Sequence, residues 1–282
     1  MDGAAVLTAR VALLDAGPGD PAAALAYFTG IMAQVTAPGV PPEPRDLMTA
    51  AISPALADEV AGRSRLLRRL QEQVPELAIG PLRLDRQQWI ATQKPRFTEV
   101  HRTWVPQESH LTAPADAATT KPFGAGLFTS TATPGPGGMW RTYLDLQPGS
   151  TLFPLPWVTW ELTPRSRVRV FEIGGADGWA RLAATYSRQA HGLIFPDWRA
   201  ISQDWDGVHM TLRAIAATQG QYLRTPAGIV AAPYWDVEST LWLRWCFDSA
   251  RVADIDGINP LPHPRDAPRL PTRPADALAR IT

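Results

Sequence analysis

Residues 234–247 read Tyr-Trp-Asp-Val-Glu-Ser-Thr-Leu-Trp-Leu-Arg-Trp-Cys-Phe, and no other stretch does more to decide the fold class. From Thr240 to Phe247 the run is rich in aromatic and apolar residues, which favours a buried β-strand. Asp236 and Glu238 stand directly before it. A carboxylate at the start of an apolar strand is costly to bury unless it has a hydrogen-bond or ionic partner or takes part in function. This stretch is therefore also a candidate functional segment.

Similar strand-like segments lie upstream. Aromatic and β-branched residues gather at 100–104, 140–146, 157–162, 167–173 and 207–212, and all eleven tryptophans fall between Trp89 and Trp245. Two helices interrupt these segments. The first is capped by Asp177 and carries an apolar stripe, and the second spans about 196–203. The stripe consists of Trp179, Leu182, Ala183 and Tyr186. Because strands outnumber helices, the predicted class is α+β.

The ends of the chain differ from this middle region. Asp20-Pro21 predicts the start of a helix with Leu25, Phe28, Met32 and Val35 on one face, and a second helix is expected over 53–73. Six prolines and no aromatic residue after Ile258 predict a tail. The expected regions are therefore a helical N-terminal region (1–80), a mixed α+β domain that would carry the catalytic site (81–258) and a Pro-rich tail (259–282). Whether residues 1–80 pack on the strands is left open.

The composition excludes several classes of protein. The 282 residues include 27 basic and 27 acidic side chains, so no net charge draws the chain to nucleic acid or to an anionic membrane. A single cysteine cannot form an intramolecular disulfide, and the five histidines match no zinc spacing, so no metal is expected. Without a signal-peptide pattern or a membrane-spanning apolar stretch, we expect a soluble, cytoplasmic protein with no membrane partner.

Common catalytic motifs are also missing from the sequence. There is no P-loop and no Gly-x-Ser-x-Gly elbow, and Cys246 lies in an apolar run that favours a small buried thiol over a nucleophile. His209 lies between Val208 and Met210, a setting that favours a hydrogen-bonded core or surface histidine over a catalytic base. Paired carboxylates cannot be selected from sequence alone.

Three segments combine polar residues with aromatic, strand-like surroundings. They are Val-His-Arg-Thr-Trp at 100–104, Lys-Pro-Phe-Gly-Ala-Gly-Leu-Phe-Thr-Ser-Thr at 121–131, and Tyr-Trp-Asp-Val-Glu-Ser-Thr at 234–240. In this order they resemble the ADP-ribosyltransferase superfamily of the Arg, Ser-Thr-Ser, x-x-Glu type. The resemblance covers about residues 97–250. It implies a pair of antiparallel sheets around a cleft, with NAD as substrate.

The resemblance implies three catalytic residues. Cleavage of the nicotinamide glycosidic bond develops positive charge on the ribose, and Glu238 would stabilise that charge. Arg102 would bind the pyrophosphate or the adjacent ribose with its planar fork. Ser130 would orient Glu238. Thr129 and Thr131 alternate to the other face of the same strand, so only one of the two sets can point at the site.

Other residues would complete the site by the same resemblance. His101 and Thr129 join Arg102 as cofactor-binding candidates, since a His-type variant of the superfamily would use His101. Phe128, Trp140 and Tyr143 are candidates for an aromatic wall against nicotinamide. Asp236 falls where the family places its acceptor-facing residue, but glutamate or glutamine is usual there. This departure leaves the acceptor, a protein or a nucleic acid, undefined.

Two main hypotheses follow. In the first, the chain is a mono-ADP-ribosyltransferase, such as a toxin or effector, with N-terminal helices that dock a protein partner; an NAD glycohydrolase would share its site. In the second, the chain is a non-catalytic, aromatic-rich interaction protein with a degenerate site. The enzyme hypothesis expects Arg102, Ser130 and Glu238 to converge on one cleft. A buried Glu238 paired elsewhere would end it.

Overall fold

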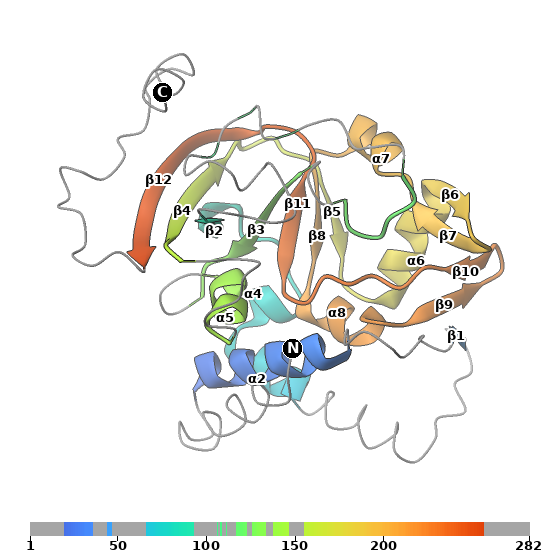
Figure 1. Ribbon diagram of the computed structural model, residues 1–282, viewed down its shortest axis with the longest axis horizontal. Helices are drawn as coiled ribbons and strands as arrows, with labels where there is room; N and C mark the ends of the chain where they lie inside the picture. The colour runs from blue at the N-terminus through green and yellow to red at the C-terminus, as the bar shows by residue number, and fades with distance from the viewer. Residues whose placement is uncertain are drawn as a thin grey trace.

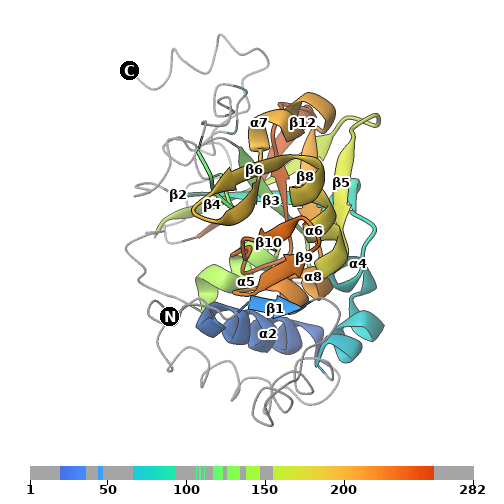
Figure 2. The same ribbon diagram turned by 90° about the vertical axis from the view of Figure 1, so that its right-hand side faces the viewer.

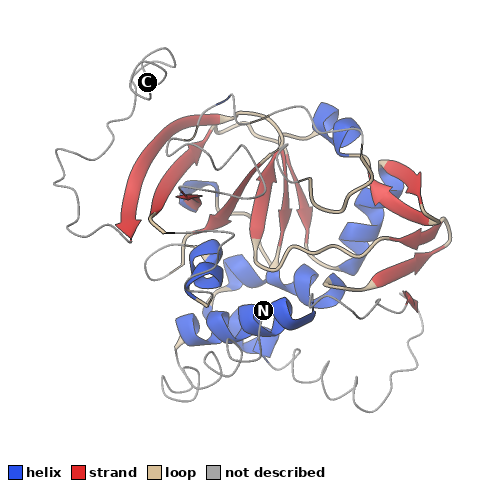
Figure 3. Ribbon diagram, in the orientation of Figure 1, coloured by secondary structure: helices blue, strands red, loops and turns tan. Residues whose placement is uncertain are grey.

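The computed structural model describes residues 20–35, 44–46, 66–92, 117–122, 126–133, 138–146 and 155–256, with the single positions 106, 108 and 111. These residues form two β-sheets and several helices, so the α+β class is confirmed (Figure 1). Figure 3 shows the helices α2, α4, α5 and α8 gathered below the larger sheet. Among the described residues, no helix is both long enough and apolar enough to span a membrane.

The larger sheet has seven strands in the order β12-β4-β2-β3-β11-β8-β5. Neighbouring strands are antiparallel except β5 and β8, which are parallel. Their bounds are β2 Gln87–Thr92, β3 Leu127–Thr131, β4 Trp157–Pro164, β5 Val170–Ile173, β8 Gly207–Met210, β11 Ser239–Trp242 and β12 Phe247–Asp256. The stretch that decides the class thus supplies β11, near the centre of the sheet.

The smaller sheet has five short strands in the order β1-β9-β10-β7-β6 and faces the viewer in Figure 2. Its strands are β1 Pro44–Asp46, β6 Ser187–Ala190, β7 Leu193–Pro196, β9 Tyr222–Thr225 and β10 Gly228–Val230. The pairs β1–β9 and β10–β7 are parallel. Both sheets are therefore mixed, which differs from the purely antiparallel pair expected from the family resemblance.

Most of the helical segments pack on one face of the seven-stranded sheet or beside the smaller sheet, whereas the short helix at 84–86 packs on the opposite face of the larger sheet. They are α2 Pro21–Val35, residues 66–73, α4 Pro75–Ala78, η1 Leu84–Arg86, α5 Met139–Asp145, α6 Ala176–Thr185, α7 Trp198–Asp204 and α8 Leu212–Thr218. One apolar cluster joins α2, α6 and α8 to strands of both sheets. A second cluster, rich in tryptophan, lies on the other face of the seven-stranded sheet.

The N-terminal helix follows its sequence signals. Asp20 accepts a hydrogen bond from the backbone N–H of Ala22, and Leu25, Phe28 and Met32 are buried as predicted. These three side chains belong to the same cluster as Leu241 of β11. The described helices of residues 1–80 therefore pack on the strand-rich region.

Other predicted elements have mixed outcomes. The strand expected at 157–162 and the two helices after 176 and 196 are confirmed by β4, α6 and α7. The strand expected at 207–212 is confirmed as far as Met210, the end of β8, and Leu212 already begins α8. The strand expected at 167–173 is limited to β5, and the single strand expected at 240–247 is divided between β11 and the start of β12. The N-cap of α6 is Gly175, with Asp177 in the first turn. The segment 100–104 and the tail 259–282 lie outside the described residues.

The strand predicted at 140–146 is wrong, because Met139–Asp145 forms helix α5. Aromatic and β-branched residues suggested a strand, yet Trp140, Tyr143 and Leu144 also have helical spacing. These three side chains pack together in one small apolar cluster. Tertiary packing on one helical face therefore outweighs the local β-propensity.

Candidate functional site

Glu238 lies immediately before β11, between the ends of β3 and β8. In the sheet register Thr240 pairs with Thr129 on one side and with His209 on the other, and His209 pairs with Glu172 of β5. Directly paired residues project to the same face of a sheet. Thr129, Thr240, His209 and Glu172 thus form a polar row across four adjacent strands.

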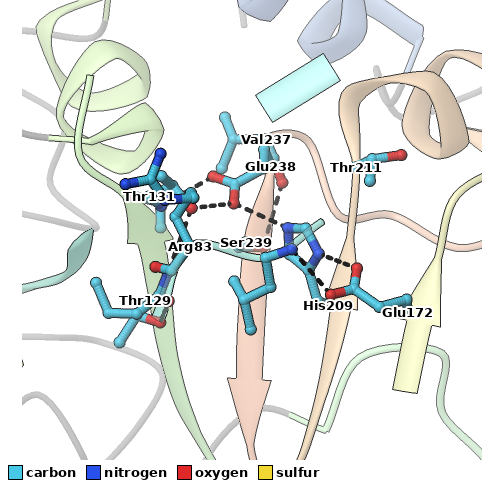
Figure 4. A network of polar contacts seen from close by, with 12 residues as sticks. Arg83, Thr129, Thr131, Glu172, His209, Thr211, Val237, Glu238 and Ser239 are labelled. Carbon is cyan, nitrogen blue, oxygen red and sulfur yellow. Dashed lines mark hydrogen bonds and ion pairs between the residues drawn. The ribbon is translucent and has the colours of Figure 1, made fainter. Parts of the chain in front are cut away.

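The Glu238 carboxylate is completely buried and held by three hydrogen bonds (Figure 4). Its Oε2 atom accepts the backbone N–H of Thr131 at 3.0 Å. Its Oε1 atom accepts the Thr131 hydroxyl at 2.8 Å and contacts His209 Nε2 at 3.0 Å. An ionised carboxylate offers about four acceptor positions, so the described residues fill three of them. Glu238 is therefore a satisfied buried carboxylate.

His209 lies between two carboxylates. Its ring is fully buried, with Nδ1 2.5 Å from Glu172 Oε2 and Nε2 on Glu238. Burial lowers the pKa of His209, but the hydrogen bonds and charges of Glu172 and Glu238 outweigh burial and raise it to about 9. Near neutral pH the ring is thus an imidazolium that donates from both nitrogens.

Glu172 connects this buried pair to the surface. Its side chain is 40% exposed, and its second oxygen accepts the backbone N–H of Leu82 at 3.0 Å. Burial raises the pKa of Glu172, but hydrogen bonding to His209, the charge of His209 and the bond from Leu82 lower it below the ordinary value. The three charged groups therefore run from the protein surface to a fully buried carboxylate.

The polar network continues through β3. The Gln87 side chain donates to the Thr131 hydroxyl at 3.2 Å and accepts from the Thr129 hydroxyl, which itself accepts the indole N–H of Trp242 at 2.8 Å. Among the described residues, the buried Thr240 hydroxyl has no hydrogen-bond partner. Thr129 therefore orders the network at the Trp242 end and does not contact Glu238.

Ser130 is not brought to Glu238. Because side chains alternate along β3, Ser130 faces the other side of the sheet from Thr131. There its Oγ atom accepts the backbone N–H of Trp140 at 3.2 Å, in the first turn of α5. Of the two alternating sets considered from sequence, the structure brings Thr131 to the glutamate, and Ser130 accepts a backbone N–H that the first turn of α5 leaves unpaired.

The expected aromatic wall also lies on the Ser130 side of β3, where it surrounds a cation of the protein itself. Lys121 Nζ is 5.3 Å from the ring centroid of Phe128 and 5.1 Å from that of Trp140. Tyr143 packs edge-on against Trp140 with centroids 5.5 Å apart. Phe128 and Trp140 thus face Lys121 on the opposite side of the sheet from the Glu238 carboxylate.

Asp236 belongs to the environment of Lys121. Its Oδ2 atom is 3.7 Å from Lys121 Nζ, and its Oδ1 atom accepts the Gln219 side-chain amide at 2.7 Å. Burial raises the pKa of Asp236 and lowers that of Lys121, although each charge counteracts the shift of the other. Asp236 has a positive φ of 64°, a strained backbone conformation for a residue with a side chain.

The remaining sequence candidates are settled only in part. Arg102 and His101 lie outside the described residues. In the part of the chain that the structure describes, no group of three His, Cys, Asp or Glu residues could hold a metal ion. Cys246 is buried, and burial is the main cause that raises the pKa of its thiol to about 12. This agrees with the expected inert thiol.

His209 and Glu172 are the site residues that sequence reasoning did not assign to the site. Each is a lone titratable residue between apolar neighbours, in Val208-His209-Met210 and Phe171-Glu172-Ile173. Two such positions on strands form a hydrogen-bonded pair only if the strands are adjacent. An isolated titratable residue in an apolar strand was therefore a signal that could have marked each of these residues as a site candidate. Their pairing could not be predicted, because it depends on the order of the strands in the sheet.

Comparison with known proteins gives no relative on which to base a function. No family model, no curated protein and no solved structure matches the chain.

Proposed function

We propose that the protein is an NAD-dependent mono-ADP-ribosyltransferase with an ADP-ribosyltransferase-like fold, in which Glu238 stabilises the charge that develops on the ribose. In the proposed step the bond between the ribose and the nicotinamide nitrogen breaks, and nicotinamide leaves with the bonding electrons. An acceptor nucleophile then attacks the ribose carbon and loses its proton. The acceptor is a protein or a nucleic acid.

One observation carries the proposal. The two described motifs of the resemblance, Thr-Ser-Thr and x-x-Glu, come from segments more than a hundred residues apart, yet Thr131 and Glu238 are joined by two hydrogen bonds of 3.0 and 2.8 Å. The family resemblance assigned the orienting role to Ser130, which is the neighbour of Thr131 in the same motif. One acceptor position of the carboxylate has no partner among the described residues, but the side chain is fully buried, so a ribose hydroxyl would reach it only after neighbouring groups move.

The geometry changes the proposed roles. Thr131 takes the orienting role that the sequence suggested for Ser130. The aromatic residues Phe128 and Trp140 face Lys121 on the other side of β3, so they do not support the nicotinamide wall. The roles of Arg102 and His101 remain predictions from sequence.

The complete burial of Glu238 favours a second candidate function. A carboxylate without exposed surface contacts no substrate until neighbouring groups move, and its present partners satisfy it as a structural group. In this alternative the protein is a non-catalytic interaction protein, and the Glu172–His209–Glu238 series only stabilises its core. The two functions differ in whether NAD is consumed.

The test is the release of nicotinamide from NAD by the purified chain, compared between wild type and Glu238→Gln. Gln has the size of Glu but cannot stabilise positive charge, so we expect a loss of about a hundredfold or more in turnover. A labelled product on added protein or nucleic acid would distinguish transfer from NAD hydrolysis. A wild type that neither binds nor consumes NAD would refute the enzyme and favour the second candidate.

A matched pair of variants on β3 tests the revised roles. Thr131→Val keeps the shape of the side chain but removes the hydroxyl that donates to Glu238, so we expect a clear fall in nicotinamide release. Ser130→Ala removes the hydroxyl that accepts the Trp140 backbone N–H on the opposite face and should lower it less. Circular dichroism spectra confirm that both variants fold. The reverse order of effects would contradict the assignment of Thr131.

A further inference from the structure

We propose that His209 is a positioning residue for Glu238: its ring is hydrogen-bonded between Glu172 and Glu238 and holds the Glu238 carboxylate in one orientation. This inference rests on the proposed function. It adds two residues, His209 and Glu172, that the motif resemblance does not include. We call the three side chains Glu172, His209 and Glu238 the charge clamp.

The geometry of the charge clamp determines the orientation of Glu238. The two ring nitrogens of His209 point in opposite directions, one to Glu172 at 2.5 Å and the other to Glu238 at 3.0 Å (Figure 4). A ring that is bonded at both nitrogens cannot rotate without losing both contacts. On its other side Glu238 is bonded to Thr131. The carboxylate is therefore held from β3 and β8, the two strands that flank β11.

The charges also favour one ionisation state. The hydrogen bonds and charges of Glu172 and Glu238, one on each side of the ring, raise the pKa of His209, so the ring keeps its proton near neutral pH. Among the described residues, the charged groups in contact with the ring are Glu172 from β5 and Glu238 from the segment before β11. The neighbouring β3 contributes the neutral Thr131, and the segment before η1 contributes the Leu82 amide to Glu172.

Glu172 is the residue of the charge clamp that can be substituted without removing a direct contact of Glu238. It is the partly exposed member, and it contacts His209 but not Glu238 in the described network. A change at Glu172 therefore reaches Glu238 only through the histidine. An effect of Glu172 on turnover of NAD would be transmitted by His209.

The test compares Glu172→Gln with the matched control Glu161→Gln. Glu161 lies on β4 of the same sheet, is similarly exposed, and pairs with the surface residue Arg251. For Glu172→Gln we expect kcat for nicotinamide release to fall about tenfold with little change in KM, because orientation and charge of the carboxylate act in the transition state. In its pH profile, the loss of activity at alkaline pH should occur about one pH unit lower than in wild type, because His209 loses a neighbouring carboxylate that favours its protonated form. Glu161→Gln should behave as wild type.

A second measurement does not require NAD. The ring signals of His209, assigned by comparison with His209→Gln, are followed by NMR from pH 6 to 10. We expect a protonated ring at pH 7 that titrates near pH 9, with a lower midpoint in Glu172→Gln and in Glu238→Gln. If the wild type releases no nicotinamide, the proposed function fails while this titration still tests the clamp. A neutral ring at pH 7, or an active enzyme in which Glu172→Gln keeps the wild-type kcat and pH profile, would overturn the inference.

Discussion

The charge on His209 connects the stability of the folded chain to pH. The imidazole has a pKa of about 9 in the folded state, compared with an ordinary value of 6.5. A group whose pKa is raised by folding stabilises the native state fully below its unfolded pKa. That contribution is lost as the pH rises through the folded pKa. The clamp should therefore stabilise the protein at pH 6.5 and lose its effect between about pH 7 and pH 9.5.

We expect this loss in the free energy of unfolding, measured by urea denaturation with tryptophan fluorescence. The difference between wild type and His209→Gln should shrink by on the order of 3 kcal/mol from pH 6.5 to pH 9.5, because the variant lacks the titrating ring. Taking the difference removes the contribution of groups that do not contact His209, such as the Cys246 thiol, whose pKa is raised to about 12. A difference independent of pH would show that the ring is not charged in the native state.

At the level of single residues, the sequence identified some members of the site and missed others. Glu238 could be selected because a carboxylate before an apolar strand stands out. The sequence could not show whether Ser130 or the two flanking threonines lie on the same face of the sheet as Glu238. That depends on the register between β3 and β11, in which Thr240 pairs with Thr129, and this register is set by tertiary structure. His209 and Glu172 are 37 positions apart and meet only because β5 and β8 are parallel neighbours.

Helix α5 contacts β3 more closely than a side chain at its N-cap permits. Gly138 is the N-cap, and a Cβ atom there would lie 2.8 Å from the backbone oxygen of Thr131 and still closer to Ser130 Oγ. The backbone of β3 cannot move away from the added Cβ atom as a flexible side chain could. Gly138→Ala should therefore separate α5 from β3 and lower the free energy of unfolding by about 1–3 kcal/mol, measured by urea denaturation.

Gly175→Ala is the matched control for this prediction. Gly175 is also the N-cap of a helix, α6, and its backbone is extended, so any residue can adopt it. The atom nearest to an added Cβ is Oδ1 of Asp177, 2.9 Å away at the end of a side chain that can rotate. Both variants replace a glycine N-cap by alanine, so a difference between their free energies of unfolding reports the clash with the backbone of β3. Equal effects in the two variants would contradict the close packing of α5 on β3.

The elements that the sequence predicted correctly are those whose apolar residues recur at a clear spacing or dominate the segment. Helices α2 and α6 carry buried residues at helical spacing, and the long strand β4 is aromatic and apolar. The short strands of the smaller sheet were missed. Ser187–Ala190 and Tyr222–Thr225 are four residues each, partly polar and half-exposed, so neither period nor composition distinguishes them from loops. Their pairing with β7 and β10 makes them strands.

For the molecule as a whole, helix α6 connects the two sheets. Its buried face lies in the same apolar cluster as Leu223 and Val230 of the smaller sheet and Val208 of the larger one. The fully buried Trp179 of α6 also donates its indole N–H to the backbone oxygen of Ala231 at 2.9 Å, just after β10. Because one core serves both sheets, we expect them to unfold together in one cooperative transition.

Trp179→Phe tests this cooperativity. The change removes the hydrogen bond to Ala231 and leaves a cavity in the shared core, which should lower the free energy of unfolding by about 2 kcal/mol. In hydrogen exchange measured by mass spectrometry, the slowest amides of β9 and β10 and those of β3 and β11 should then all exchange about thirtyfold faster, because the same global opening exposes them. Trp205→Phe, a half-buried tryptophan whose N–H bonds the Tyr186 hydroxyl, should have a smaller effect. Faster exchange confined to the smaller sheet would show that the two sheets open separately, and the N-terminal helices packed on the larger sheet would then belong to a different folding unit from α6.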